Sequence, residues 1–331
     1  MEFTKSPATF FVEEIMHPQL GGGRFFYYIL EKHGIDSFSA VKLLEEHNKT
    51  HVSFAGAKDA NATTRQWISS IKELKSPDTR MALEFKGMGE HRIYTGMHSA
   101  NRFDVKFGNV DGEETDRIKM LLKKSAFPNY FDEQRLSPAT VELAQALLGG
   151  KWEDAAKAAL GAEGRMQSEK SKKIRQIIRE NWGSWKKLID DPQVPESKKG
   201  FFRLLLAGGD FKSALPELER NTISIACRTA QALIFNEALA KEISKQNARD
   251  QRHIEIAQGK FPVKFSYRGT KRGLKAAPVY PRNGVLERKT YFEAKHARLS
   301  RGADGACLLS FELKKGCYGT ILLKCLQAII D

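Results

Sequence analysis

The chain has 331 residues, 41% of them apolar, which is enough for at least one large core, so two domains are expected. Its 54 Lys and Arg against 40 Asp and Glu give a formal charge of +14, which favours a polyanionic partner: RNA, DNA or an anionic membrane. Because no run of about 18 apolar residues occurs and residues 1–5 lack a signal-peptide core, we expect a cytoplasmic protein without a membrane contact.

The first third of the chain has an α+β pattern. Ser37 or Ser39 could cap the first predicted helix. The strand predicted at 51–55 leads into the polar segment 56–61, where a glycine eases a turn and a loop can present side chains. The periodicity predicts strands near residues 10–12, 51–55, 81–85 and 102–107, and helices at 38–47 and 114–124.

The character of the chain changes between about residues 138 and 245, where only helices are predicted. A basic, turn-rich stretch follows at 259–289, then a strand at 308–313 and a helix at 320–330. The simplest topology is a discontinuous α+β domain built from both ends of the chain, with a helical unit inserted between them. Helical spacing within this unit occurs at 143–148, 152–160, 174–178, 201–206 and 222–243.

The segment 56–66 is the strongest candidate for chemistry. It places the single carboxylate of Asp59 among Lys58, Arg65 and several amide and hydroxyl groups. Cations and hydrogen-bond donors favour the charged form of a carboxylate, so Asp59 could act as a nucleophile or base at neutral pH. The alternative is a solvated aspartate in a turn.

Basic and aromatic residues are interleaved between residues 259 and 289. Phosphates pair with Lys and Arg, and exposed rings stack on unpaired bases, so this stretch could bind RNA. Equally, the rings could belong to the core and the charges to the solvated surface. The cations expected on the RNA backbone are Lys264, Arg268, Lys271, Arg272 and Lys275.

Other candidate sites are weaker. Gly21-Gly22-Gly23-Arg24 lacks the spacing of a phosphate-binding loop, and a turn is the simpler interpretation. His47 and His51 stand four residues apart without forming a His-Glu-x-x-His motif, so no metal is expected. The four cysteines form no Cys-x-x-Cys pair, which indicates reduced, mostly buried thiols.

The stretch around Asp59 resembles a known signature. It contains Gly56-Ala57-Lys58-Asp59, then Ala62, Thr64 and Gln66. This is similar to the pattern Gly-x-Lys-Asp-x-x-Ala-x-Thr-x-Gln of the TruD family of pseudouridine synthases. In that family the aspartate is the nucleophile, and the match places it on Asp59.

Further segments resemble the same family in the same order. They are residues 7–14, with Thr9 in place of an acidic residue; 95–103, with Ala100 in place of glycine; 129–135, with Asp132 in place of glycine; 233–236; and 311–320, with Lys314 and Gly319 in place of proline and alanine. The resemblance therefore spans essentially the whole chain.

This resemblance implies the pseudouridine synthase core, a mixed, largely antiparallel sheet flanked by helices. It implies a catalytic domain of residues 1–128 and 286–331 and a mainly helical TruD insertion domain at 129–285, with RNA in the cleft between them. The implied substrate is tRNA, typically its uridine 13, and no cofactor is implied. Phe10, Asn101 and Phe311 match base-contacting positions, and Phe103 would stack on the base.

Asp59 would carry the reaction, with Lys58 or Lys5 as the cation beside it and Arg65 and Arg135 as further candidates. Gln66 belongs to the same expected substrate site. A monomer is favoured over an oligomer. Two other classes of function stay open: an inactive RNA-binding protein or RNA chaperone with the same fold, and a metal-dependent RNA-processing enzyme.

Overall fold

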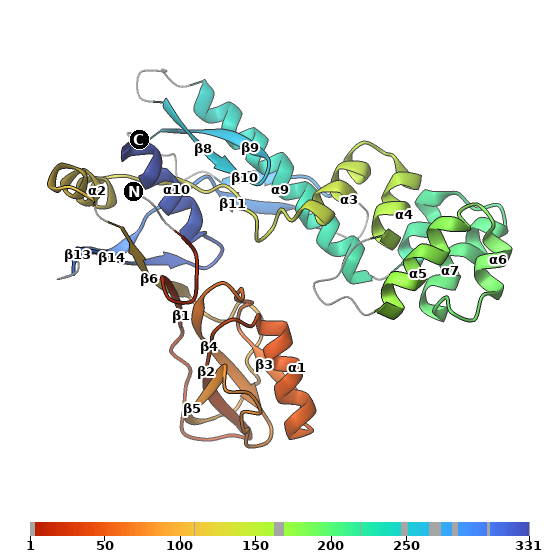
Figure 1. Cartoon of the computed structure of the whole chain (residues 1–331), viewed down its shortest axis with the longest axis horizontal. Coiled ribbons are helices and arrows are strands. Elements are labelled where there is room, and N and C mark those ends of the chain that lie inside the picture. Colours follow the sequence, from red (N-terminus) through yellow and green to blue (C-terminus); the bar gives the residue numbers. More distant parts are fainter. Residues whose placement is uncertain are drawn as a thin grey trace.

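The computed structural model describes residues 4–108, 110–161, 169–218, 220–245, 251–264, 273–279, 284–302 and 305–330. Figure 1 shows the strand-rich part of the chain and, extending from it, a lobe made of helices. The described helices are α1 (Ser37–Asn48), α2 (Gly112–Lys124), α3 (Pro138–Leu148), α4 (Trp152–Gly161), α5 (Glu169–Glu180), α6 (Trp185–Asp190), α7 (Glu196–Leu206), α8 (Phe211–Ala214), the short η1 (Leu215–Glu217), α9 (Arg220–Ser244) and α10 (Gly319–Ile330).

The main sheet has eight strands in the order β13-β14-β6-β1-β4-β2-β5, with β3 also paired to β4. They are β1 (Phe10–Ile15), β2 (Phe25–Lys32), β3 (Val52–Phe54), β4 (Thr63–Ser70), β5 (Met81–Gly89), β6 (Ala100–Phe107), β13 (Lys295–Arg301) and β14 (Cys307–Lys314). All pairings in it are antiparallel except that of β1 with β4. The predicted mixed, largely antiparallel sheet is confirmed.

Within the described ranges, three two-stranded sheets accompany the main one. They pair β7 (Phe127–Pro128) with β12 (Tyr291–Phe292), β8 (Gln251–Ile256) with β9 (Gly259–Lys264), and β10 (Gly273–Ala276) with β11 (Leu286–Lys289). The β7–β12 pair joins the two segments that flank the predicted insertion at 129–285. Backbone hydrogen bonds thus hold together the two points at which the chain would enter and leave that insertion.

Side chains on one face of the sheet form rows that cross several strands. Thr64 of β4 is aligned with Lys32 of β2 and Val12 of β1, and Val12 is aligned with Phe103 of β6. Directly opposite residues in a sheet point to the same face, and residues two apart along a strand return to it. Gln66 and Asn101 therefore share the face of Thr64, whereas Arg65 points to the other face.

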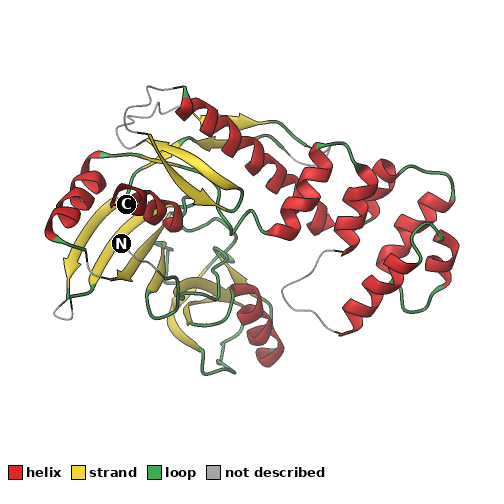
Figure 2. Cartoon of the chain, turned by 45° about the horizontal axis from the view of Figure 1, so that its top comes forward, coloured by secondary structure: helices red, strands yellow, loops and turns green. Residues whose placement is uncertain are grey.

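The buried apolar residues fall into separate clusters. One joins β1, β6, β14, α10, the later part of α9 and the β8–β9 hairpin. Another lies within α3–α9, between Leu143 and Cys227, and forms the core of the helical lobe. Figure 2 shows this lobe as helices without strands, at the opposite end of the molecule from the main sheet. The domain boundaries at 128/129 and 285/286 stay predictions.

Most predicted elements are present at the expected places, with two kinds of exception. Strands β2 and β4, and the strands β7 to β13 that lie between residues 127 and 301, are not predicted from the sequence. The N-cap of α1 is neither Ser37 nor Ser39 but Asp36, whose Oδ1 accepts from the backbone N–H of Phe38 at 2.9 Å. The hydroxyl of Ser37 points to other partners: it accepts from the backbone N–H of Lys58 at 2.8 Å and donates to Gln66 Oε1 at 2.6 Å.

Candidate active site

A cavity of about 450 Å³ opens on the sheet face that carries Thr64 and Asn101. Its size falls within the range of about 300–1,000 Å³ that is common for small-ligand sites. It is bounded by β1, β4, β6, the loop at 55–59, the turn before α3 and the N-terminus of α10. Of the predicted site residues, the cavity is lined by Lys5, Phe10, Lys58, Asp59, Asn101, Phe103 and Arg135.

Asp59 points into this cavity with about a quarter of its side chain exposed. Lys5 Nζ lies 2.8 Å from Asp59 Oδ2, and the side chains of this pair are 24% and 25% exposed. The amide of Gln134 donates to the same oxygen. A cation and an amide donor both favour the ionised carboxylate, the form that a nucleophile or base requires. Of the two expected partners, Lys5 and Lys58, only Lys5 forms the ion pair.

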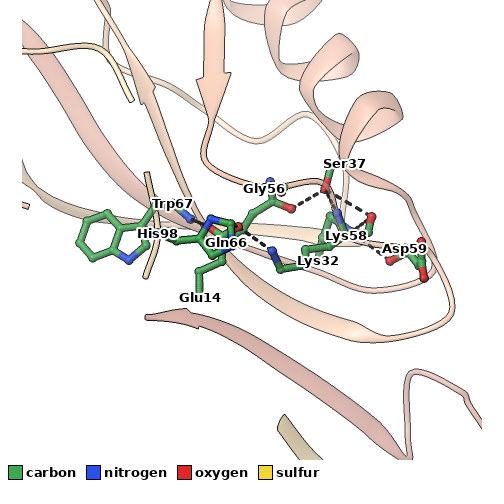
Figure 3. Close-up of polar contacts among 9 residues, drawn as sticks. All are labelled: Glu14, Lys32, Ser37, Gly56, Lys58, Asp59, Gln66, Trp67 and His98. Atoms are coloured by element: carbon green, nitrogen blue, oxygen red, sulfur yellow. Dashed lines mark hydrogen bonds and ion pairs between the residues drawn. The ribbon is translucent and has the colours of Figure 1, made fainter. Parts of the chain in front are cut away.

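Buried polar groups hold the backbone of the loop that carries Asp59 (Figure 3). The ammonium group of Lys32 donates to the carbonyl oxygens of Lys58 at 3.3 Å and Asp59 at 3.2 Å. Ser37 Oγ accepts from the backbone N–H of Lys58 at 2.8 Å. Gln66 Oε1 in turn accepts from Ser37 Oγ, and Gln66 Nε2 donates to the carbonyl of Gly56 at 3.4 Å.

Lys32 is fully buried, and it donates to Ile35 O at 2.7 Å in addition to the loop carbonyls. Burial lowers the pKa of Lys32 to about 8, while the charges of Asp36 and Asp59 act in the opposite direction. The ammonium group of Lys32 is therefore a buried positive charge next to the loop that carries Asp59, and it favours the charged form of that carboxylate.

Lys58 does not pair with Asp59, because its side chain turns to a different carboxylate. Its Nζ lies 2.6 Å from Glu14 Oε1, and the side chains are 10% and 0% exposed. The other oxygen of Glu14 accepts from the backbone N–H of Trp67 at 2.9 Å. This buried ion pair ties the loop at 56–59 to β1 and β4.

Arg65 is the clearest departure from expectation. It does not line the cavity, and it makes ion pairs on the opposite face of the sheet with Glu13, Glu31 and Glu84 at 3.2, 2.9 and 2.7 Å. Arg65 is therefore not the cation beside Asp59. The physical reason is the two-residue period of β4: with Thr64 and Gln66 on the cavity face, the residue between them must face away.

The aromatic residues form one wall of the cavity. Phe10 and Phe103 meet edge to face with ring centroids 5.9 Å apart. Phe311 is 1% exposed and stacks against Phe103 at 5.0 Å, so it supports the wall from behind and does not line the cavity. A Cβ on Gly319 would lie 2.9 Å from Phe103, so a glycine there lets the start of α10 approach this ring.

Asn101 lies on β6, and the residues before and after it have ordinary strand backbone. Among the described residues other than glycine, only Lys49 and His296 have positive φ, so Ala100 carries no left-handed strain. Ala100 pairs with Ile15 and Lys314 in regular register. The alanine that replaces the family's glycine therefore leaves the strand that presents Asn101 intact.

The turn before α3 contributes Gln134 and Arg135 to the lining of the cavity. Asp132 is 2% exposed and accepts from Lys324 Nζ at 3.0 Å and from Thr320 Oγ1 at 2.9 Å, both on α10. Its backbone carbonyl accepts from the N–H of Arg135 at 2.8 Å. The aspartate in place of glycine thus fastens the turn carrying Gln134 and Arg135 to α10.

The predicted backbone-binding cations are placed only in part. Lys264 ends β9 and Lys275 lies on β10, where its Nζ is 3.8 Å from Glu287 Oε2 and its side chain is 68% exposed. Neither lines the cavity. Arg268, Lys271 and Arg272 lie outside the described residues. Phe261, one of the interleaved rings, packs against Tyr130 at 5.3 Å and belongs to the core.

The four cysteines are free thiols, and Cys227, Cys307 and Cys325 are buried, as predicted. Among the described residues, no helix combines the length and the apolar character needed to span a bilayer. Several groups at the site were not predicted from the sequence: Glu14, Lys32, Ser37 and Gln134. Glu14 and Gln134 could have been found, because they belong to the matched segments 7–14 and 129–135; Lys32 and Ser37 are recognisable only through their burial.

A family model described as tRNA pseudouridine synthase D (TruD) matches residues 1–259 of the chain. The chain belongs to the TruD family. Among its relatives, a probable tRNA pseudouridine synthase D 2 of Methanocaldococcus jannaschii is 27% identical, over 98% of this chain and 91% of the relative. A tRNA pseudouridine synthase D of Aquifex aeolicus is 23% identical over 97% of this chain and 96% of its own length.

The fold of this TruD family member has a solved counterpart. A crystal structure of a putative tRNA pseudouridine synthase D (TruD) from Methanosarcina mazei superposes with a TM-score of 0.57, covering 95% of this chain and 90% of the other. The sequence identity is 19%, so this similarity concerns the fold. It agrees with the sheet and the inserted helices described above.

Proposed function

We propose that the protein is a tRNA pseudouridine synthase in which Asp59 acts as nucleophile or base. The observation that carries the proposal is a carboxylate of the family signature, paired with Lys5 and Gln134, at the mouth of a cavity with an aromatic wall. Its relatives over nearly the full chain are named tRNA pseudouridine synthases. The substrate uridine that we propose is position 13 of tRNA.

The reaction is an isomerisation that needs a charged oxygen and a place to hold a detached base. The bond from the ribose carbon to ring nitrogen 1 breaks, the base turns, and a bond forms from the ribose to ring carbon 5. The proton on carbon 5 is lost and nitrogen 1 gains one, so the atoms balance without an oxidant or reductant. Asp59 could add to the ring, attack the ribose carbon or abstract a ribose proton, and each route requires its ionised carboxylate.

The residues around Asp59 have separate parts in this proposal. Lys5 keeps the carboxylate charged, and Lys32 and Ser37 fix the loop that carries it. Phe10 and Phe103 offer ring faces and edges against which the base is held while it is detached, so that it rejoins at the right atom. Arg135 lines the same cavity, and we propose that it contacts a phosphate of the same nucleotide.

The uridine must leave its stack to reach this cavity, and unstacking costs a few kcal/mol. We propose that phosphate contacts from the basic surface offset that cost, with Lys264, Arg268, Lys271, Arg272 and Lys275 as the cations involved. Binding of tRNA should then weaken steeply with salt. Replacing Lys275 with Ala should reduce the slope of log affinity against log salt by about one.

The test is incubation of the purified protein with unmodified tRNA and no added cofactor, followed by mapping of pseudouridine, beside an Asp59→Ala variant. We expect product at a single uridine with the wild type and none with the variant. Equal product from both would remove Asp59 as the catalyst. Tight tRNA binding without product would favour the RNA chaperone instead, and loss of product with a chelator would favour a metal-dependent enzyme.

A further inference from the structure

Three residues that line the cavity each have a buried polar atom that lacks a hydrogen-bond partner within the part of the chain that the structure describes. These atoms are Thr64 Oγ1, His98 Nδ1 and Asn101 Oδ1. Their residues are 1%, 8% and 9% exposed. Leaving a buried donor or acceptor unsatisfied costs about 1–3 kcal/mol, so three such atoms around one cavity indicate an occupant that bonds to them.

The chemistry of the three atoms is not the same. Asn101 Oδ1 only accepts, whereas the Thr64 hydroxyl can donate or accept. The His98 ring donates to the backbone of Ala55, and burial lowers its pKa, so the imidazole is neutral at pH 7. Because Nδ1 has no partner, Nε2 makes that bond, and Nδ1 keeps the lone pair of an acceptor.

The groups around His98 do not satisfy this acceptor. Glu14 Oε1 lies 3.9 Å from His98 Nδ1, which is beyond hydrogen-bonding distance, and it is already bonded to Lys58 Nζ at 2.6 Å. A carboxylate could not donate to Nδ1 in any case. Figure 3 shows His98 beside Glu14 and Gln66, at the opposite end of the cluster from Asp59. The wall therefore offers two acceptors, on Asn101 and His98, and one hydroxyl.

Uridine and pseudouridine differ in the donors of their rings. Uridine has one ring N–H, at nitrogen 3, flanked by two carbonyl oxygens. When the detached base turns about the axis through nitrogen 3 and carbon 6, the two carbonyls exchange places and nitrogen 3 stays where it was. Pseudouridine then carries a second N–H, at nitrogen 1. Two acceptors thus match the turned base better than the starting base.

We propose that the cavity recognises the turned base, with Asn101 Oδ1 and His98 Nδ1 accepting from its two ring N–H groups and Thr64 donating to a carbonyl. This inference rests on the proposed function and adds His98 and Thr64 to the residues that bind the base. A site that bonds more fully to the turned base lowers the free energy of the later steps relative to bound uridine. His98 then acts as a binding residue for the product side of the reaction.

The test compares the affinities of two RNAs, tRNA with uridine and tRNA with pseudouridine at the mapped position. All proteins carry Asp59→Ala, which prevents turnover. Adding His98→Leu should weaken binding of the pseudouridine RNA about tenfold, the equivalent of one hydrogen bond, and change binding of the uridine RNA less than threefold. Adding Thr64→Val should weaken both RNAs by a similar factor, because both bases have the carbonyls. Equal losses for both RNAs with His98→Leu, or no loss, would overturn the proposal.

A second measurement checks that the atoms are unsatisfied in the protein without RNA. Thr64→Val should not lower the melting temperature, since it removes a buried hydroxyl that has no partner. The matched control is Thr229→Val: Thr229 is 0% exposed, and its hydroxyl donates to the carbonyl of Arg135 at 3.1 Å. We expect that variant to melt a few degrees lower. An equal decrease for Thr64→Val would contradict the inference.

Failure of this inference and failure of the proposed function give different results. A wild type that forms no pseudouridine in any tRNA would remove the proposed function, and the cavity would lose its assigned base. A wild type that forms pseudouridine, with a His98→Leu variant that keeps the preference between the two RNAs, would remove the inference alone.

Discussion

Both faces of the main sheet carry ion pairs, but the pairs differ in burial and in what they hold in place. On the cavity face, Lys58 and Glu14 form an ion pair whose side chains are 10% and 0% exposed. On the opposite face, Arg65 joins Glu13, Glu31 and Glu84, whose side chains are 33%, 43% and 49% exposed. The buried pair ties the loop of Asp59 to the sheet, whereas water screens the exposed network. Proximity in sequence to Asp59 therefore says little about whether a residue belongs to its site.

The largest effect should follow from breaking the buried pair. Lys58→Met leaves the carboxylate of Glu14 buried without its cation, a change that typically costs about 3–5 kcal/mol. Urea unfolding of the purified variant measures the loss. A double variant, Lys58→Met with Glu14→Gln, should recover part of it because no buried charge remains. If the single variant were as stable as the wild type, the pair would not hold the loop.

The next effect concerns the cation beside Asp59. Lys5→Met removes the positive charge 2.8 Å from Asp59 Oδ2 and should lower kcat/KM for tRNA about a hundredfold, with little change in the unfolding free energy. Lys42→Met is the matched control, because Lys42 pairs with Glu46 on α1 with 67% of its side chain exposed. Unchanged turnover in Lys5→Met would show that the carboxylate needs no cation.

The buried Lys32 predicts a pH dependence of stability. Its pKa is about 8 in the folded protein and 10.5 in the unfolded chain. Between these values the unfolded state binds more protons, so folding becomes more favourable as pH rises, by up to about 1.4 kcal/mol per pH unit. The unfolding free energy of the wild type relative to Lys32→Met should therefore rise from pH 8 to pH 10 and stay level below pH 8. A flat difference over that range would contradict the buried charge.

The smallest effect is expected on the opposite face of the sheet. Arg65→Met removes a cation as Lys58→Met does, but its partners are solvated, so the unfolding free energy should fall by about 1 kcal/mol or less. Turnover of tRNA should change less than threefold, since Arg65 does not line the cavity. A large loss of kcat/KM with normal RNA affinity would show that the two faces are coupled through β4.

An element was predicted correctly where the pattern of apolar and polar residues within its own segment indicates its secondary structure. Helices such as α1 and α9 were predictable because apolar residues repeat at helical spacing along one face. Strand β4 was not, since its cavity face carries Thr64 and Gln66, so that polar residues occupy both faces and the alternation disappears. Strand β2 was missed for the opposite reason: it is apolar on both faces over most of its length.

The position of Asp59 followed from the signature, but its surroundings did not. Lys5 is 54 residues away along the chain and Gln134 is 75 residues away. Lys58 and Arg65, which are close in sequence, face other carboxylates. Proximity along the chain favours Lys58 and Arg65 as partners of Asp59. The parallel pairing of β1 with β4 instead brings the segment before β1, which carries Lys5, beside the loop that precedes β4.

By itself, the sequence determined the family, the α+β class, Asp59 as the candidate nucleophile or base and the polyanionic character expected of the partner, because motif, periodicity and net charge are properties of residue order and composition. Tertiary structure alone decided which cation pairs with Asp59, which face Arg65 occupies, and that Thr64, His98 and Asn101 meet around one cavity with unsatisfied atoms. Those results depend on strand register and burial, which bring together groups from β1, β4, β6 and the segments between them. The free energy that selects one register comes from the whole core, so no single segment of the chain encodes it.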